Sequence, residues 1–241
     1  MPILPVLLLG LLFGVKHATE TDHLAAVSVI VSERRGWRAA ARAGAFWGLG
    51  HTLSIVAAGL LVLALHVVIP ERVARLLELV VALMIIALGG AALARALRSR
   101  TDLHVHEHTH DGVRHRHLHF HEPAGAHAAN PHEAVPHTHR LGSGGLKPFL
   151  VGIVHGLAGS AALTLLVLAQ ITSVPLGLLY LALFGVGSIG GMAAMSLALS
   201  LPFSAAAAQP GLYRGLRIAT GILSLGFGLV YAWSQIRGVA V

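Results

Sequence analysis

The sequence predicts an all-α, polytopic membrane protein with six transmembrane helices, and three observations support this fold class. Of its 241 residues, 55% are hydrophobic and 11% are charged, whereas soluble chains average about 25% charged residues. Six long apolar segments follow one another, most of them long enough to cross about 30 Å of hydrocarbon. Lys and Arg are concentrated in alternate loops, so the net charge of +7 is typical of membrane loops and does not predict nucleic-acid binding.

The apolar segments are separated by short loops that contain Gly, Pro or charged residues. They span roughly 3–31, 42–69, 73–97, 148–172, 175–201 and 213–236. One long polar insert, 99–147, follows the third segment, and we expect it to be a flexible loop within a single membrane domain, 1–241. The first segment lacks the basic start and the small-residue cleavage site of a signal peptide, so we expect it to be retained.

The two halves of the chain resemble each other at a near-constant offset. The matching tripeptides and tetrapeptides are Gly14-Val15-Lys16-His17 with Gly152-Ile153-Val154-His155, Gly48-Leu49-Gly50-His51 with Gly185-Val186-Gly187-Ser188, and Ala87-Leu88-Gly89 with Ser224-Leu225-Gly226. Each copy would contain three helices, which is an odd number of membrane crossings, so the second copy must lie in the membrane with the opposite orientation. The predicted repeats are 1–98 and 148–241, with a substrate site expected at their interface near the midplane. Chance similarity among small apolar residues is the alternative.

The distribution of basic residues predicts the orientation. Thirteen of them fall in the loop after the first helix, in the insert with its flanks, and in the loop after the fifth helix, against three on the other side. The thirteen are Arg34, Arg35, Arg38, Arg42, Arg95, Arg98, Arg100, Arg114, Arg116, Arg140, Lys147, Arg214 and Arg217; the three are Arg72, Arg75 and Arg237. We therefore expect a multi-pass protein of the cell (inner) membrane with both termini outside and the insert in the cytoplasm.

Polar residues interrupt the first apolar segment at His17-Ala-Thr-Glu-Thr-Asp-His23. His17 lies about 20 Å along a helix from Ile3, near the bilayer midplane. Two imidazoles and the carboxylates of Glu20 and Asp22 are costly at that depth unless a cation, water or one another compensates for their lost hydration. Histidine with carboxylate is a ligand set for divalent transition metals.

A regular helix cannot aim all four of these groups at one ion. At 100° per residue, His17, Glu20 and His23 form one sloping stripe, whereas Asp22 points away from His17. We therefore expect either a break in the helix near 19–21 or a role for Asp22 in fixing the tautomer of a histidine ligand. The break is the favoured interpretation.

Further ligands are expected from His51 in the second apolar segment and from His155 in the fourth. Neighbouring glycines permit close helix approach at both positions, and the alternative for each is an interhelical hydrogen bond. The candidate metal residues are thus His17, Asp22, His23, His51, His155 and Glu20, with Ser160 and Ser188 as second choices. The chain has no Cys, which argues against a copper(I) site, and an N/O shell favours Ni, Co or Zn. His66, just before Pro70, is expected to be interfacial.

The insert contains twelve histidines between residues 104 and 139, mostly in His-x-His spacing. Imidazoles at this density bind transition metals weakly and multivalently. We expect a cytoplasmic metal buffer, sensor or feeder, and the alternative is a solvated linker that binds metal incidentally.

Two motifs resemble those of the permease-type nickel/cobalt transporters. They are Lys16-His17-x4-Asp22-His23 and Phe46-Trp-Gly-Leu-Gly-His51-Thr. Glu20 stands where that family usually has Asp, and Thr21 where Ala is common. The acidic element expected in the fourth helix is replaced by Val154-His-Gly-Leu-Ala-Gly-Ser160-Ala-Ala-Leu, which is similar to the shorter, six-helix, urease-accessory-like branch. The resemblance implies that His17, Asp22, His23 and His51 select and move the ion.

The sequence therefore predicts a carrier of Ni²⁺, with Co²⁺ as a further cargo, and uptake is preferred over efflux. The metal is a transported substrate, and no tightly bound cofactor is expected. Expected partners are the metal ion, the lipid bilayer and a cytoplasmic metallochaperone; nucleic acid is not expected, and the oligomeric state is open. The competing classes are an intramembrane metal sensor, a subunit of a larger permease, and a metalloenzyme, for which the His-Glu-x-x-His pattern is missing.

Overall fold

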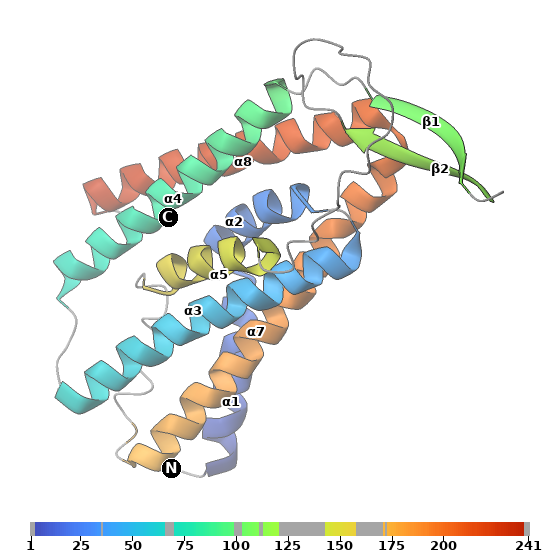
Figure 1. Ribbon diagram of the computed structural model, residues 1–241. Helices are drawn as coiled ribbons and strands as arrows, with labels where there is room; N and C mark the ends of the chain where they lie inside the picture. The colour runs from blue at the N-terminus through green and yellow to red at the C-terminus, as the bar shows by residue number, and fades with distance from the viewer. Residues whose placement is uncertain are drawn as a thin grey trace.

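The computed structural model describes residues 3–34, 36–65, 70–98, 103–110, 113–120, 143–157, 171 and 173–238. Within these ranges the chain is a bundle of helices with one small β-hairpin at one end (Figure 1). The elements in chain order are α1 (Ile3–His17), α2 (Thr21–Ser32), α3 (Trp37–Leu65), α4 (Glu71–Arg98), β1 (Leu103–His110), β2 (Val113–Phe120), α5 (Ser143–Gly156), α7 (Val174–Ala205), the short 3-10 helix η2 (Ala206–Ala208) and α8 (Pro210–Arg237).

The first predicted transmembrane segment is two short helices instead of one long helix. α1 ends at His17 and α2 begins at Thr21, so the break predicted near 19–21 is confirmed. Glu20 has extended backbone angles, φ −64° and ψ 152°, which no α-helical residue can adopt. The Thr19 hydroxyl donates a hydrogen bond to the Lys16 carbonyl, and this bond satisfies one of the carbonyls left free where α1 ends.

Four of the described helices are long and apolar enough to cross a membrane, namely α3, α4, α7 together with η2, and α8. Large aliphatic residues on the outward faces of these helices are exposed, including Leu53, Leu83, Val186 and Leu223. A soluble protein would not leave so many apolar side chains in water. The fourth predicted segment, 148–172, is represented by α5 and then by residues that lie mostly outside the described ranges.

The most buried helix is α2, at the centre of the bundle (Figure 1). It contacts α3, α4, α7 and α8. Its apolar residues Ala26, Val27 and Val31 belong to the main core cluster, together with side chains of the surrounding helices. The polar residues at its start, Asp22 and His23, are therefore enclosed by protein and not by lipid.

The helices approach closely through matching glycines in the two halves of the chain. α1 packs on α7, and a Cβ on Gly14 would lie 2.1 Å from the carbonyl oxygen of Phe184. α5 packs on α3, and a Cβ on Gly152 would lie 2.1 Å from the carbonyl oxygen of Trp47. Similarly, Gly187 faces the backbone of α1, and Gly50 faces the backbone of α5. Only glycine permits backbones to touch in this way.

The polar insert contains regular structure that the sequence analysis did not predict. Its residues 103–110 and 113–120 pair as antiparallel strands, and α5 begins at Ser143, inside the range assigned to a flexible loop. The expected loop 99–147 was therefore wrong in these two parts. The hairpin lies at the same end of the molecule as the end of α4 and the start of α8 (Figure 1).

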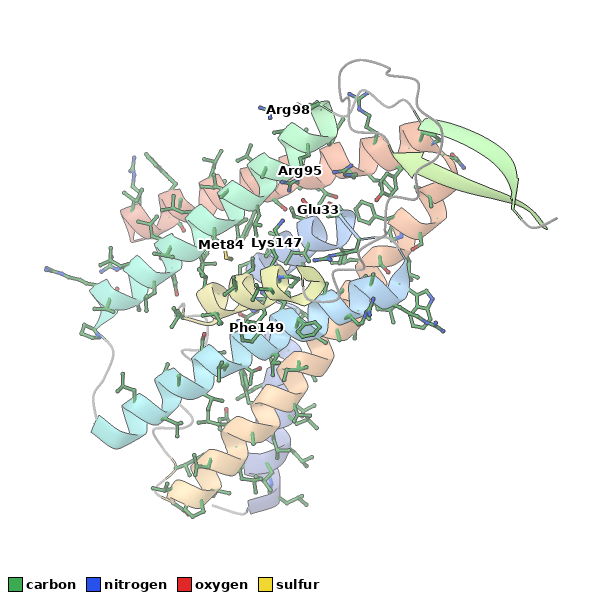
Figure 2. The ribbon with its side chains drawn as sticks, viewed as in Figure 1. Glu33, Met84, Arg95, Arg98, Lys147 and Phe149 are labelled. Carbon is green, nitrogen blue, oxygen red and sulfur yellow. The ribbon has the colours of Figure 1, made fainter. Side chains whose placement is uncertain are left out.

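Glu33, the first residue after α2, joins the two halves at this same end of the bundle. Its carboxylate forms ion pairs with Arg95 at the end of α4 and with Lys147 in α5, the latter at 3.2 Å. Figure 2 shows the three side chains gathered beside one another. Arg95 and Lys147 were predicted to lie on the same side of the membrane, and in the structure they contact the same carboxylate.

Candidate metal centre

The break between α1 and α2 brings five of the six predicted metal residues into one buried cluster. His17 is the last residue of α1, and Asp22 and His23 open α2. His51 in α3 and His155 in α5 face them. His23, His51 and His155 have no solvent exposure, and His17 and Asp22 have 4% and 7%. All five were predicted from the sequence, and the structure places them together.

The first part of the cluster consists of His17, His23 and His51. One nitrogen from each of these imidazoles lies within 4.8 Å of the other two. The Nε2 atoms of His17 and His51 are 2.8 Å apart, so one of them must carry a proton and donate it to the other. The ring centroids of His17 and His23 are 4.5 Å apart. Three imidazoles at these separations need only small shifts to coordinate one ion at about 2.0–2.1 Å per bond.

The second part consists of Asp22, His23 and His155, again with ligand atoms within 4.8 Å of one another. Asp22 Oδ1 accepts hydrogen bonds from the backbone N–H and the Nδ1–H of His23, both at 2.8 Å. Asp22 Oδ2 accepts one from Nε2 of His155, at 2.9 Å. His23 belongs to both groups, so the two groups form one continuous centre.

These hydrogen bonds determine which nitrogens carry lone pairs. A carboxylate accepts only from protonated nitrogens, so Asp22 fixes the Nδ1–H tautomer of His23 and the Nε2–H tautomer of His155. The remaining nitrogens, His23 Nε2 and His155 Nδ1, are buried and have no hydrogen-bond partner among the described residues. Asp22 thus has the tautomer-fixing role that the sequence analysis gave as an alternative, in addition to the helix break. Buried imidazole lone pairs without a partner are costly unless a ligand occupies them.

Glu20 has the same effect on His17. Its Oε2 lies 3.0 Å from His17 Nδ1, which leaves the Nε2 atom of His17 directed at His51. Glu20 is about one-third exposed and is absent from both metal groups, so it orients His17 and is not itself placed as a ligand. The indole of Trp47 lies against His23 and His155, and the ring of Phe184 lies against His17. These aromatic rings exclude water from the cluster.

The second-choice residues and Lys16 are placed less favourably. Ser188 is fully buried on α7, but it belongs to neither metal group. Ser160 and His66 lie outside the described residues. The Lys16 side chain is exposed, and no ion pair joins it to Glu20 or Asp22 within the described ranges. Lys16 is therefore not part of the buried cluster.

One carboxylate near the centre was missed by the sequence analysis. Glu78 is a half-buried residue of α4 that interacts electrostatically with Asp22 and with Tyr231 of α8. The signal was present, because an acidic residue inside an apolar segment is a functional candidate by default. Glu78 does not stand beside a histidine in the sequence, as Glu20 and Asp22 do, so the pattern of histidine with carboxylate did not single it out.

Comparison with known proteins gives one extended match. The chain is 31% identical over 233 residues to the urease accessory protein UreH of Bacillus sp. (strain TB-90), covering 96% of this chain and 92% of that protein. The chain belongs to the UreH family. No family model and no solved structure matches it.

Membership of the UreH family agrees with the architecture. A urease accessory family together with these long apolar helices makes the chain a multi-pass membrane protein. The relative is named as an accessory protein of urease and not for a catalytic activity of its own. The resemblance to the shorter urease-accessory branch of the nickel/cobalt transporters is thus supported at the level of the family.

Proposed function

We propose that this UreH-family protein carries Ni²⁺ across the membrane through the cluster of His17, Asp22, His23, His51 and His155, with Co²⁺ as a second cargo. The observation that carries the proposal is the pair of unpartnered imidazole nitrogens whose tautomers Asp22 fixes. Imidazole with carboxylate suits Ni²⁺ better than Mg²⁺ or Ca²⁺, which prefer oxygen-only shells. The resemblance of the two histidine motifs to those of the permease-type nickel/cobalt transporters favours nickel and cobalt among the transition metals.

The site suits a travelling ion. Asp22 is the only carboxylate in the two metal groups, so a single anionic ligand faces a dication, and the other ligands are neutral imidazoles. Such binding is weak and reversible, as a carrier requires, and no resident cofactor is proposed. The broken helix supplies free backbone groups at the same depth, a feature that recurs at transporter binding sites.

The matching glycine contacts support an inverted three-helix repeat in a single membrane domain. The Gly14 contacts with Phe184 and Ser188 correspond to the Gly152 contacts with Trp47 and His51, and the offsets are those found in the sequence. Under this assignment the first repeat contains α1 to α4 and the second begins with α5. His17 and His155 become equivalent positions at the repeat interface. Rocking of one repeat against the other would then expose the centre to either side.

Uptake is the proposed direction. The excess of basic residues at the hairpin end favours an orientation with that end in the cytoplasm and both termini outside. In that orientation the membrane potential favours cation entry by about 2.3 kcal/mol per charge per 100 mV. A cytoplasmic metallochaperone is the proposed recipient of the ion.

Radioactive nickel accumulation in cells that produce this chain alone tests the proposal. We expect accumulation with the wild-type chain and at least a tenfold loss in the His17→Ala variant, because one ligand of the centre is removed. Ser234→Ala is the matched control, since Ser234 is buried in α8 and donates only to Tyr231 of its own helix.

Proteoliposomes that contain only the purified chain separate the alternatives. Entry of Ni²⁺ driven by an inside-negative potential supports a self-sufficient importer. Depletion of cellular nickel would show efflux, and equal accumulation by wild type and His17→Ala would refute the transport proposal in favour of a sensor or a subunit.

A further inference from the structure

Glu78 is a carboxylate inside a membrane-crossing helix, and no basic residue neutralises it. It lies in α4, which is long and apolar enough to cross a membrane, and its side chain is half-buried. Among the described residues it has no hydrogen-bond or ion-pair partner. The basic residue one turn earlier, Arg75, forms its ion pair with Glu71, at 3.3 Å. An acidic side chain in such a position is a functional candidate.

The packing of α4 against α8 determines the level at which Glu78 lies. The two helices run side by side and antiparallel (Figure 1). A Cβ on Gly228 of α8 would lie 3.3 Å from the carbonyl oxygen of Ala82 in α4. A Cβ on Gly238, at the end of α8, would meet the side chain of Arg75. Glu78 lies between these two contacts and is therefore level with the last turns of α8.

The packing of α8 against α2 places the start of α2 close to the same level. The Tyr213 hydroxyl at the start of α8 donates to the carbonyl of Ser32 at the end of α2. Further along α8, the Ser224 hydroxyl donates to the carbonyl of Ala25, at 2.7 Å. The two helices are thus antiparallel, and the part of α8 that follows Ser224 runs beside the start of α2. Asp22 lies there, and α4 also contacts α2 directly.

Electrostatic interactions connect Glu78 with the candidate metal centre. Glu78 interacts with Asp22, and Tyr231 in the last turns of α8 interacts with both carboxylates. Glu20 is the other acidic residue near the centre, but it contacts His17 and is about one-third exposed, so solvent screens its charge. Glu78 is therefore a carboxylate that acts on the centre from α4 and has no partner of its own.

We propose that Glu78 is the counter-charge that makes the centre prefer a divalent cation to a monovalent one. Asp22 is the single anionic ligand and balances one charge of a dication, and Glu78 balances the second charge from α4 without touching the ion. The energy of two charges is proportional to their product, so a fixed negative charge stabilises a dication twice as strongly as a monocation at the same place. A cation in the centre in turn favours the charged form of Glu78. This inference rests on the proposed metal centre and names the residue that sets its charge preference.

The fluorescence of Trp47 measures ion binding at the centre. Its indole is fully buried and lies against His23 and His155, with ring centroids 5.4 and 5.5 Å apart, so an ion bound there quenches it. The other two tryptophans, Trp37 and Trp233, are more than half exposed, and replacing both by Phe removes their emission. The full-length protein in lipid nanodiscs is titrated with nickel nitrate and with silver nitrate at buffered free-ion concentrations. Each titration gives a dissociation constant for the centre.

Glu78→Gln should weaken nickel binding by the square of the factor by which it weakens silver binding. The lost charge costs Ni²⁺ twice the free energy that it costs Ag⁺, so a roughly threefold loss for silver predicts a roughly tenfold loss for nickel. Glu78→Asp keeps the charge and should bind nickel within about twofold of wild type. Glu33→Gln is the matched control, because it removes the same charge about 16 Å along α2 from Asp22. It should change both constants less than about twofold.

The outcomes separate the role of Glu78 from the existence of the centre. Unchanged nickel binding in Glu78→Gln, or equal losses for the two ions, would overturn the role of Glu78, because a packing defect weakens both ions alike. A loss in Glu78→Asp as large as that in Glu78→Gln would overturn it as well. If nickel does not quench Trp47 when Glu78 is intact, the centre itself and the proposed transport through it are refuted.

Discussion

The two halves of this chain use the same glycine positions for packing but contain different chemistry. Gly14 and Gly152 make equivalent close contacts, with the backbones of α7 and α3 respectively. Yet the residue contacted one turn further along is Ser188 in α7 and His51 in α3. Four of the five clustered candidate ligands come from α1 to α3, and only His155 comes from the second half. Helix spacing and metal chemistry are therefore encoded by separate sets of residues.

The largest expected effect comes from replacing His51 in α3 by serine, the residue that α7 has at the corresponding position 188. His51→Ser removes a fully buried imidazole of the first metal group and leaves His17 Nε2 without its partner. We expect the nickel concentration for half-maximal transport to rise at least about tenfold, since even a partner one step removed from the metal is worth that much. Radioactive nickel uptake into proteoliposomes measures the change.

Ser188→Ala is the matched change in the second half. Because Ser188 belongs to neither metal group, we expect transport to change less than about twofold. Similar losses of transport in His51→Ser and Ser188→Ala would show that both halves supply ligands. That result would contradict a centre whose ligands come mainly from the first half.

Much of the site could be predicted from the sequence because its ligands are costly in a membrane. Charged and imidazole groups inside apolar segments are rare, so His17, Asp22, His23, His51 and His155 were visible as a set. The helix break was also predictable, because 100° per residue sets Asp22 apart from His17. The detailed role of Asp22 was not, because whether its carboxylate reaches His155 depends on how α5 packs against α2 and α3.

The pairing of the two strands in the insert was not predicted from the sequence. The His-x-His spacing of its histidines was interpreted only as a sign of metal affinity, and not as the alternation of a β-strand. The period of two in His104, His106, His108 and His110, followed by Asp111-Gly112, is the signal that indicated a hairpin. Glu78 was missed for a related reason, since the ionisable residues with which it interacts, Asp22 and Tyr231, are distant from it in sequence.

A second prediction addresses the shared packing. Gly14→Ala and Gly152→Ala would each place a methyl group about 2.1 Å from a backbone carbonyl oxygen of the neighbouring helix. Because backbone cannot move aside as a flexible side chain can, we expect each variant to lose about 1–3 kcal/mol of stability. The apparent melting temperature in detergent should fall by similar amounts in both variants.

Gly90→Ala provides the control for these two substitutions. Gly90 is also in the middle of a helix, but a Cβ there meets nothing within 4 Å. Gly90→Ala should raise the free energy of unfolding by up to about 1 kcal/mol, because glycine is the poorer helix former. A stable Gly152→Ala beside a destabilised Gly14→Ala would contradict the equivalence of the two halves. Close backbone packing would then matter between α1 and α7 but not between α5 and α3.

The smallest expected effect concerns Glu33, which joins the halves through charge and not through packing. Its ion pairs with Arg95 and Lys147 are partly exposed to solvent, and such pairs contribute less than about 1 kcal/mol each. Glu33→Gln keeps the shape and removes the charge, so the melting temperature should fall by no more than about 2–4 °C. High salt should narrow the difference, because partly exposed charges are screened. A larger loss that salt leaves unchanged would mean that Glu33 holds the two halves together by contacts other than these ion pairs.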